Sequence, residues 1–255
     1  MSTTNTATAQ NIPKEIERFD IIFRIQHVVM FTTFLLLSFT GWGLKYAHEP
    51  QGVASWWIRV WGGAETAGLI HRIAGVTMLV DFATHCVYLS YLFVVGKITW
   101  DSRTTIIPIP KDILDVIKNF MYYFGLSKEK ARFGKFSYAQ KFDYWAVFWG
   151  MFIIGTSGFA LAFPIFFSHF VPQFTSGWIW EVLSIMHSDE ALLAIVFILF
   201  WHFYNEHLKP EVFPMSWTWI TGKISTDTLK HHHPLEYEMR FPGASADHDS
   251  KGKKD

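Results

Sequence analysis

The sequence predicts an all-α integral membrane protein, a four-helix bundle with an additional interfacial helix on its cytoplasmic side. Hydrophobic residues make up 50% of the 255 residues, and 12 Trp and 25 Phe exceed what a soluble domain of this size needs. Four apolar stretches are long enough to cross a hydrocarbon core, which takes about 20 helical residues. We expect the spans at about residues 21–46, 66–95, 143–167 and 185–207.

The distribution of Lys and Arg predicts how these spans are oriented. Basic residues gather in segment 1–20, in loop 96–142 and in tail 210–255, whereas the other two connections hold few. The positive-inside rule then places both termini and the long loop in the cytoplasm, around a membrane domain at 21–209. We therefore expect a multi-pass protein of the inner membrane, surrounded by lipid, with no folded domain outside the spans.

The start of the chain and its overall charge exclude two further possibilities. The first 20 residues lack the order of charged, apolar and small residues that a signal peptide needs, so we expect the first span to be retained. The formal net charge is zero, which argues against a nucleic-acid partner, because phosphate binding depends on a surplus of basic residues.

The loop between the second and third spans contains the interfacial helix. Between Pro110 and Gly125, apolar residues that include Ile113, Ile117 and Phe120 fall on one helical face. A helix of this kind is typical of a segment that lies in the membrane surface.

The third span has no histidine but carries several small residues. Gly150, Gly155 and Gly158 lie close to one another in the sequence, and small residues at such spacings let helices approach closely. This pattern predicts a helix whose main task is packing.

Histidines in the other spans point to a cofactor. A polar ionisable group in a bilayer is costly, so each of these residues needs a reason. The second span holds His71 and His85, and the fourth holds His187 and His202. Fourteen or fifteen residues give about 21 to 23 Å of rise, and each pair returns to within about 60° of one face. The result is two layers of imidazoles.

Two layers of imidazoles fit two b-type haems. Haem iron used for electron transfer takes two axial ligands, and histidine is a common one. The single cysteine, Cys86, excludes an internal disulfide, a haem attached through a cysteine pair and an iron–sulfur cluster held by this chain alone.

Depth in the membrane predicts the outer pair of ligands. His71 and His187 are the obvious combination there, and Gly75 follows His71 by one turn, where a flat macrocycle must pass close to the backbone. Arg72 and Arg24 are candidates to pair with haem propionates.

The inner layer holds more candidates than one haem requires. His27, His85, His202 and His207 compete for two positions, and depth does not decide between them. His85 has a second explanation, because Asp81 lies four residues earlier on the same helix face, where the pair could form a proton path or satisfy each other.

Several segments together resemble one family, the gamma-type cytochrome b subunits of membrane formate dehydrogenases, thiosulfate reductases and related nickel–iron hydrogenases. The resemblance covers about the whole membrane region, with its pieces in the family's order. They are Arg24 to His27 in FRIQH, His71 to Gly75 in HRIAG, GKFSYAQK from Gly134 to Lys141, the helix-four residues His187 and His202, and KHHHP from Lys230 to Pro234.

The resemblance implies a complete set of ligands. His71 and His187 would hold the outer haem b, and His27 and His202 the inner one, which removes His85 from the set. A second resemblance, to the cytochrome b of quinol:cytochrome c reductases, would instead pair His85 with His202, but that family has a longer chain with more spans.

The same resemblance implies a quinone pocket beside the inner haem, for menaquinone or ubiquinone. Ser137, Tyr138 and Gln140 lie near its expected entrance, where polar groups must hold carbonyl oxygens. The sequence departs from the family at Ser137 and Ala139, where the family often has Asn and Gly, and its two helix-four ligands are one residue further apart.

These observations predict the electron-transfer subunit of a respiratory oxidoreductase complex rather than a complete enzyme. Electrons would pass between an outer redox subunit and the quinone pool, the partner being an iron–sulfur subunit of a molybdenum enzyme or hydrogenase, or a multihaem c-type cytochrome. The alternatives are a stand-alone transmembrane haem reductase and a non-redox proton or metal-ion transporter. The run His231 to His233 is expected to be a surface or partner contact.

Overall fold

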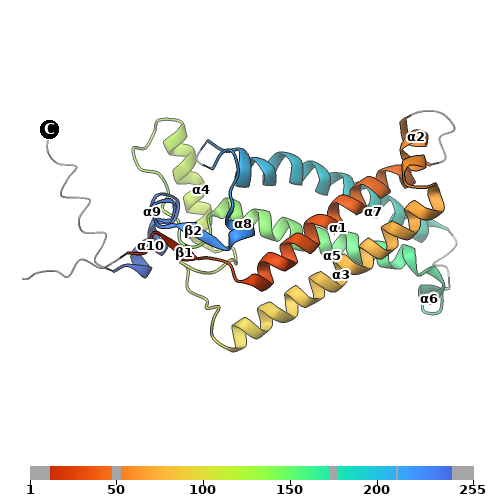
Figure 1. Cartoon of the computed structure of the whole chain (residues 1–255), viewed down its shortest axis with the longest axis horizontal. Helices are drawn as coiled ribbons and strands as arrows, with labels where there is room; N and C mark the ends of the chain where they lie inside the picture. Colours follow the sequence, from red (N-terminus) through yellow and green to blue (C-terminus); the bar gives the residue numbers. More distant parts are fainter. Residues whose placement is uncertain (1–11, 48–52, 173–176, 211, 243–255) are drawn as a thin grey trace, which may run out of the picture.

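Four long helices lie side by side and form the body of the protein (Figure 1). The computed structural model describes residues 12–47, 53–172, 177–210 and 212–242. The long helices are α1 (Ile21–Lys45), α3 (Ala64–Val94), α5 (Tyr138–Ala162) and α7 (Trp178–Phe197), and α7 continues through two π-helical turns, η1 (Ile198–His202) and η2 (Tyr204–Leu208).

The prediction of four spans is confirmed. Among the described residues, four helical segments are long and apolar enough to cross a membrane: Ile21–Lys45, Ala64–Val94, Tyr138–Ala162 and Trp178–Leu208. Many of their large apolar side chains are exposed, as expected for helices whose outer faces contact lipid.

The third and fourth long helices begin before the predicted spans, because local capping and not hydropathy sets the helix ends. α5 begins at Tyr138 rather than near residue 143, since the Ser137 hydroxyl accepts a hydrogen bond from Gln140 N at 3.3 Å and Gln140 Oε1 accepts one from Ser137 N at 3.2 Å. This reciprocal pair is a capping box. α5 ends before Pro164, and α7 begins directly after Gly177 rather than near residue 185.

Two short helices lie at one end of the bundle, which we call the far end. They are α2 (Val53–Val60) and α6 (Pro164–Ser168), at the right of Figure 1. The indole N–H of Trp57 in α2 donates to the carbonyl oxygen of Phe39 in α1 at 2.8 Å, which fixes α2 against the bundle.

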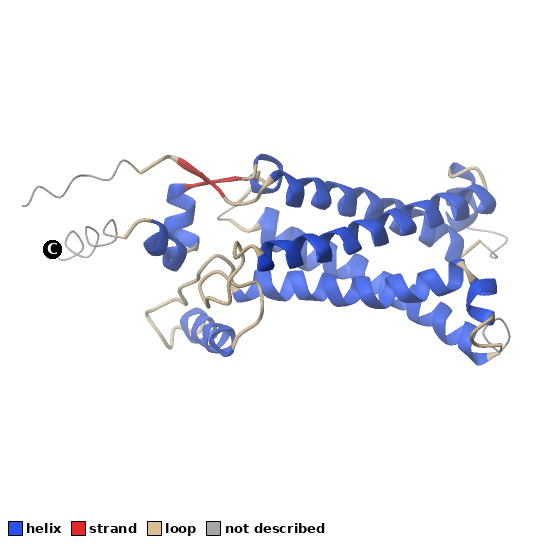
Figure 2. Cartoon of the chain, turned by 90° about the horizontal axis from the view of Figure 1, so that it is seen from below, coloured by secondary structure: helices blue, strands red, loops and turns tan. Residues whose placement is uncertain are grey.

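Helix α4 (Pro110–Tyr123) runs across the direction of the long helices at the opposite end (Figures 1 and 2). Ile113, Ile117 and Phe120 are exposed, at 66%, 50% and 59%. Its polar side binds the bundle, because Asp112 pairs with Lys141 at 3.0 Å and Asn119 donates to the Tyr138 hydroxyl at 3.2 Å. A helix forms where the sequence predicts one, with the amphipathic character of a membrane-surface helix.

A small folded unit, which we call the terminal module, lies at this same end, called here the module end. Strand β1 (Glu15–Glu17) pairs antiparallel with β2 (Lys223–Ser225), with Ile16 opposite Ile224. Helices α8 (Thr218–Thr221), α9 (Thr226–His232) and α10 (Pro234–Arg240) complete the module around a core of Ile224, Leu229 and Tyr237. The expectation of no folded domain outside the spans was therefore wrong.

Arg18 connects three distant parts of the chain in this module. Its guanidinium pairs with Glu236 at 2.9 Å, where both side chains are buried, and it also donates to the carbonyl oxygen of Lys135. Arg240 binds the second oxygen of Glu236 at 2.9 Å. Because a buried charge without its partner is costly, these pairs hold the N-terminal segment, the loop and the C-terminal segment together.

His233 is buried in the module, so the expectation of a surface contact was wrong for this residue. It is 6% exposed; its Nδ1 lies 2.7 Å from Gly134 O and its Nε2 lies 3.2 Å from Arg18 Nη2. Since Gly134 O can only accept and the guanidinium can only donate, the ring is neutral with its proton on Nδ1. Burial first, and then the positive charge of Arg18, lower the pKa of His233 to about 3.

We therefore expect acid to weaken the terminal module. Below a pH of about 6.5 the unfolded module takes up a proton at His233 that the folded module refuses. The free energy that neutral His233 contributes to folding of the module is present in full above that pH. It falls by about 1.4 kcal/mol per pH unit as the pH drops toward the pKa of His233 in the folded module. Hydrogen exchange of residues 223–240, followed by mass spectrometry between pH 7 and pH 5, measures this loss.

His233→Gln keeps a donor and an acceptor but does not titrate, so it should flatten this pH dependence. His231→Gln, at an exposed neighbour, is the matched control and should leave the dependence as in the wild type. If module stability changes with pH by the same slope in the wild type and both variants, the assignment of the pH dependence to His233 is contradicted.

Candidate functional site

A large cavity extends through the bundle. It has a volume of about 2920 Å³, and its walls come from all four long helices and from the terminal module. This is several times the roughly 300 to 1000 Å³ of a pocket for a small molecule. The cavity therefore has room for more than one large ligand, and the histidines predicted from the sequence line it.

At the far end, His71 of α3 faces His187 of α7 across this cavity. The ring centroids lie 6.1 Å apart with an interplanar angle of 78°. His71 Nδ1 lies 2.9 Å from the Thr40 hydroxyl oxygen, and His187 Nδ1 lies 3.1 Å from Ile154 O and 3.3 Å from Ser157 Oγ.

These contacts determine the protonation of both rings. The Thr40 hydroxyl donates its own proton to Leu36 O at 2.6 Å, so its oxygen accepts from His71 Nδ1–H. The carbonyl of Ile154 likewise accepts from His187 Nδ1–H. Both rings are then neutral, with an Nε2 lone pair that no hydrogen bond from the described residues engages. This is the form in which histidine binds a metal.

Two glycines make room for these rings. A Cβ atom built on Gly158 would lie 2.7 Å from His187 Cε1, and one built on Gly41 would lie 3.2 Å from His71 Cε1. Gly158, expected only to help helices pack, thus also supports the ring of His187. Gly75 lines the cavity, but the nearest side-chain atom to its built Cβ is Leu37 Cδ2 at 3.8 Å, an ordinary contact distance.

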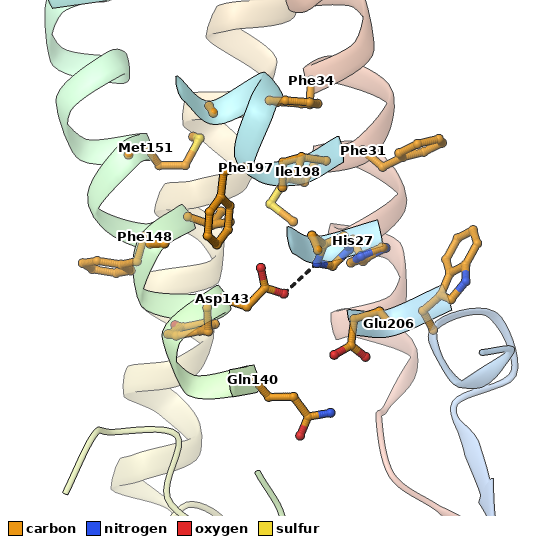
Figure 3. A pocket seen from close by; sticks show the side chains of 18 of the residues that line it. His27, Phe31, Phe34, Gln140, Asp143, Phe148, Met151, Phe197, Ile198 and Glu206 are labelled. Atoms are coloured by element: carbon orange, nitrogen blue, oxygen red, sulfur yellow. Dashed lines mark hydrogen bonds and ion pairs between the residues drawn. The ribbon is translucent and has the colours of Figure 1, made fainter. Parts of the chain in front are cut away.

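At the module end, His27 of α1 faces His202 of η1. The ring centroids lie 6.4 Å apart at 35°. His202 Nδ1 is bound to Asp143 Oδ2 at 2.6 Å, and Figure 3 shows the Asp143 carboxylate directed toward this pair. Trp219 of α8 lies against the His27 ring at 5.3 Å, so the terminal module forms one wall of the site.

The π-helical turns bring His202 into this position. A π-turn takes one more residue than an α-turn. It therefore compensates for the spacing of His187 and His202, which is one residue longer than that of His71 and His85. His202 can thereby lie near the face of His187 although the two are fifteen residues apart. No feature of the sequence pattern predicted this turn.

Both pairs have the spacing of two axial ligands on one metal atom. An imidazole nitrogen binds a first-row metal at about 2 Å, and the ring centroid lies about 1 Å beyond, so two ligands in line have centroids about 6 Å apart. The observed 6.1 and 6.4 Å agree with that separation. With the size of the cavity and the glycines at its wall, the residues fit two haem groups.

His85 lies at the depth of the module-end pair, but its surroundings differ. Its Nδ1 lies 3.1 Å from Gln26 Oε1 and its Nε2 lies 3.1 Å from the Tyr144 hydroxyl, so protein groups engage both ring nitrogens. Asp81 lines the cavity, and among the hydrogen bonds of the described residues none joins Asp81 to His85. His207 lies one π-turn beyond His202 on the same helix, with ring centroids 6.2 Å apart.

The two candidate partners of propionates also line the cavity. Arg24 precedes His27 by one turn, and its Nε is buried without a partner among the described residues. Arg72 follows His71, and its Nε donates to Gly68 O at 3.2 Å. Each arginine thus lies next to one of the two histidine pairs.

The residues expected at a quinone entrance have structural partners. Ser137 and Gln140 form the capping box of α5, and the Tyr138 hydroxyl accepts a hydrogen bond from Asn119. Gln140 also borders the cavity close to Asp143 and Glu206 (Figure 3).

Sequence reasoning missed the groups that orient the rings. Thr40, Ser157 and Asp143 are polar residues inside apolar helices at the depths of the two pairs. A buried Asp is the strongest such signal, since an acid in a span needs a partner as much as a histidine does.

Comparison with known families agrees with this geometry. The family model described as prokaryotic cytochrome b561 matches residues 18–205, which is most of the 255-residue chain and covers the first three spans and nearly all of the fourth. No curated protein matches the chain. The chain belongs to the prokaryotic cytochrome b561 family and is a membrane protein that binds haem b and transfers electrons.

Proposed function

We propose that this chain is the di-haem, quinone-reactive cytochrome b subunit of a respiratory oxidoreductase, of the kind found in membrane formate dehydrogenases, thiosulfate reductases and nickel–iron hydrogenases. The observation that carries the proposal is the presence of two facing histidine pairs in one cavity, with ring centroids 6.1 and 6.4 Å apart. Family membership favours this function over a non-redox transporter.

In this proposal each pair holds one haem b. His71 and His187 would hold the iron at the far end, and His27 and His202 would hold it at the module end, with Arg72 and Arg24 available to pair with the propionates. When bound, a haem supplies a carrier for one electron. The protein orients His71, His187 and His202 through the hydrogen bond on Nδ1, which fixes the tautomer and the ring plane.

The two sites differ in the charge of these supporting groups. At the far end the partners of Nδ1 are the hydroxyls of Thr40 and Ser157 and the carbonyl of Ile154, whereas at the module end the partner is the Asp143 carboxylate. An anion behind a ligand makes it a stronger donor and favours the oxidised metal. We therefore propose that the module-end haem has the lower potential.

We further propose that the module end faces the cytoplasm and that quinone reacts there. The basic loop 96–142 and the described part of the tail, residues 212–242, lie at this end, in agreement with the positive-inside rule. The partner, an iron–sulfur subunit or a multihaem c-type cytochrome, would then dock at the far end, beside the haem of His71 and His187. Co-purification of such a subunit separates this proposal from a stand-alone reductase.

Removing one ligand should remove one haem. His71→Ala or His187→Ala should abolish the far-end haem, and His27→Ala or His202→Ala the module-end haem, because low-spin iron in each site depends on both imidazoles. Haem per protein from the pyridine haemochrome, together with low-spin signals in electron paramagnetic resonance, should fall from two to one. His85→Asn is the control and should retain both haems; loss of a haem in that variant would refute the ligand set.

Adding a side chain at Gly158 should disturb one haem only. In Gly158→Ala the new Cβ would displace the His187 ring, and the affinity for the far-end haem should fall by about 10- to 100-fold, as for other changes in ligand support. Gly150→Ala on the same helix is the control, since its Cβ would meet only Glu190 Oε1, at 3.3 Å. Titration of each apoprotein with haem measures the affinity of the far-end site in both variants. Equal far-end affinities in Gly158→Ala and Gly150→Ala would contradict the role given to Gly158.

Neutralising Asp143 should raise the potential of one haem. Asp143→Asn keeps an acceptor for His202 Nδ1–H but removes the charge, so the module-end haem should shift upward by an amount on the order of tens of millivolts. A redox titration followed at the haem absorption bands measures the shift, with the far-end haem as the internal reference. Equal shifts of both haems, or of neither, would count against this role.

A further inference from the structure

A second polar cluster lies in the cavity at the depth of the module-end pair. It consists of Gln26 of α1, His85 of α3 and Tyr144 of α5, so three helices contribute one residue each. Gln26 Oε1 lies 3.1 Å from His85 Nδ1, and His85 Nε2 lies 3.1 Å from the Tyr144 hydroxyl. None of these residues belongs to the proposed haem ligands.

The hydrogen bonds determine where the protons of this cluster lie. With Gln26 Oε1 as the acceptor, His85 carries its proton on Nδ1, and its Nε2 accepts from the Tyr144 O–H. The cluster is then a chain in which Tyr144 donates to His85 and His85 donates to Gln26. The Tyr144 hydroxyl can rotate, so its proton can be directed either to His85 or to a ligand in the cavity.

One end of the chain has an unused donor. Gln26 is only 7% exposed, and its Nε2 is buried without a partner among the described residues. Nearly all buried polar groups in proteins have a partner, so this amide calls for an acceptor from outside the chain. A carbonyl oxygen matches its two N–H groups.

Aromatic side chains surround the cluster. Phe23 makes an edge contact with His85 at 5.9 Å, and Phe148 lies 6.4 Å from the Tyr144 ring and 5.1 Å from Phe82. A wall of this type with a few fixed polar groups suits a flat apolar ring that carries polar oxygens at its edge.

We propose that Gln26, His85 and Tyr144 bind the head group of a quinone. The Gln26 amide donates to one carbonyl oxygen, and the Tyr144 hydroxyl turns its proton from His85 Nε2 to the other carbonyl oxygen when the quinone binds. The inference deepens the proposed function and rests on it, because it assigns the quinone site of the same cytochrome to these residues rather than to Ser137 and Tyr138.

The residues near the loop are less suited to this task. The Ser137 hydroxyl and Gln140 Oε1 are engaged in the capping box, and the Tyr138 hydroxyl holds Asn119 of α4. Binding a quinone through those groups would cost contacts that fix α4 and the start of α5.

Reduction of one quinone to one quinol takes two electrons and two protons. One electron comes from each of the two proposed haems, which are oxidised, and one proton goes to each carbonyl oxygen. Tyr144 gives its proton to the quinone. His85, which takes up a proton from water at Nε2 and is then an imidazolium, passes that proton to the Tyr144 oxygen and returns to the neutral form with its proton on Nδ1. The second proton comes from water beside Gln26, whose amide binds the quinone but gives up no proton.

The test uses the full-length haem-loaded protein in lipid nanodiscs. The haems are reduced with dithionite, the excess is removed, and reoxidation by menadione is followed by stopped-flow absorbance. Tyr144→Phe, which removes a single oxygen, should slow reoxidation at low menadione by about tenfold, the usual effect of one buried hydrogen bond. Gln26→Leu should slow it similarly, with both haems retained.

Tyr138→Phe is the matched control, because it removes the same atom from a neighbouring tyrosine and should leave the rate unchanged. Calorimetric titration of the oxidised proteins with menadione provides a readout that needs no turnover. Menadione should bind more weakly to Tyr144→Phe than to the wild type, and equally well to Tyr138→Phe. Unchanged binding and rate in Tyr144→Phe, or a larger loss in Tyr138→Phe, would overturn the inference.

The outcomes also separate this inference from the proposed function. Wild-type protein whose reduced haems menadione does not reoxidise would refute the quinone reaction itself. Rapid wild-type reoxidation with no effect in Tyr144→Phe or Gln26→Leu would refute only the site. Loss of a haem in His85→Asn would identify His85 as a ligand and overturn both the site and the ligand set.

Discussion

A histidine inside an apolar bundle must find partners for two ring nitrogens, and the remaining features of this protein follow from how each ring does so. His71, His187 and His202 each have Nδ1 bound to a protein oxygen, so Nε2 is left for iron. His85 instead has protein groups at both nitrogens. The same residue type at similar depth thus serves two purposes, and the neighbouring helices, through Thr40, Asp143, Gln26 and Tyr144, decide which.

The body of the fold could be predicted from the sequence because hydropathy alone determines which segments can cross a membrane. The four spans and α4 were found in this way. Their ends were less predictable, since the capping box of Ser137 and Gln140 and the break at Gly177 act through single residues within otherwise continuous patterns. The terminal module was missed because its strands have three residues each and its centre is the ion pair of Arg18 and Glu236, which resemble surface residues in sequence.

Depth counted along the helices paired His71 with His187 but left four candidates in the other layer. Choosing among them requires contacts between residues that are far apart in sequence. Asp143 lies 59 positions before His202, and Gln26 lies 59 before His85. The π-turn at His202 is equally invisible to a count based on regular α-helix, although it places that ring opposite His27.

The terminal module has a consequence for how the protein matures in the cell. It joins β1, near residue 15, to α10, which ends at Arg240, so it cannot close until most of the chain has left the ribosome. The far-end pair and the groups that orient it lie on the four long helices, whereas the module-end pair gains its Trp219 wall when the module folds. Cofactor insertion is therefore expected in a fixed order during biogenesis, with the far-end site complete first and the module sealing the second.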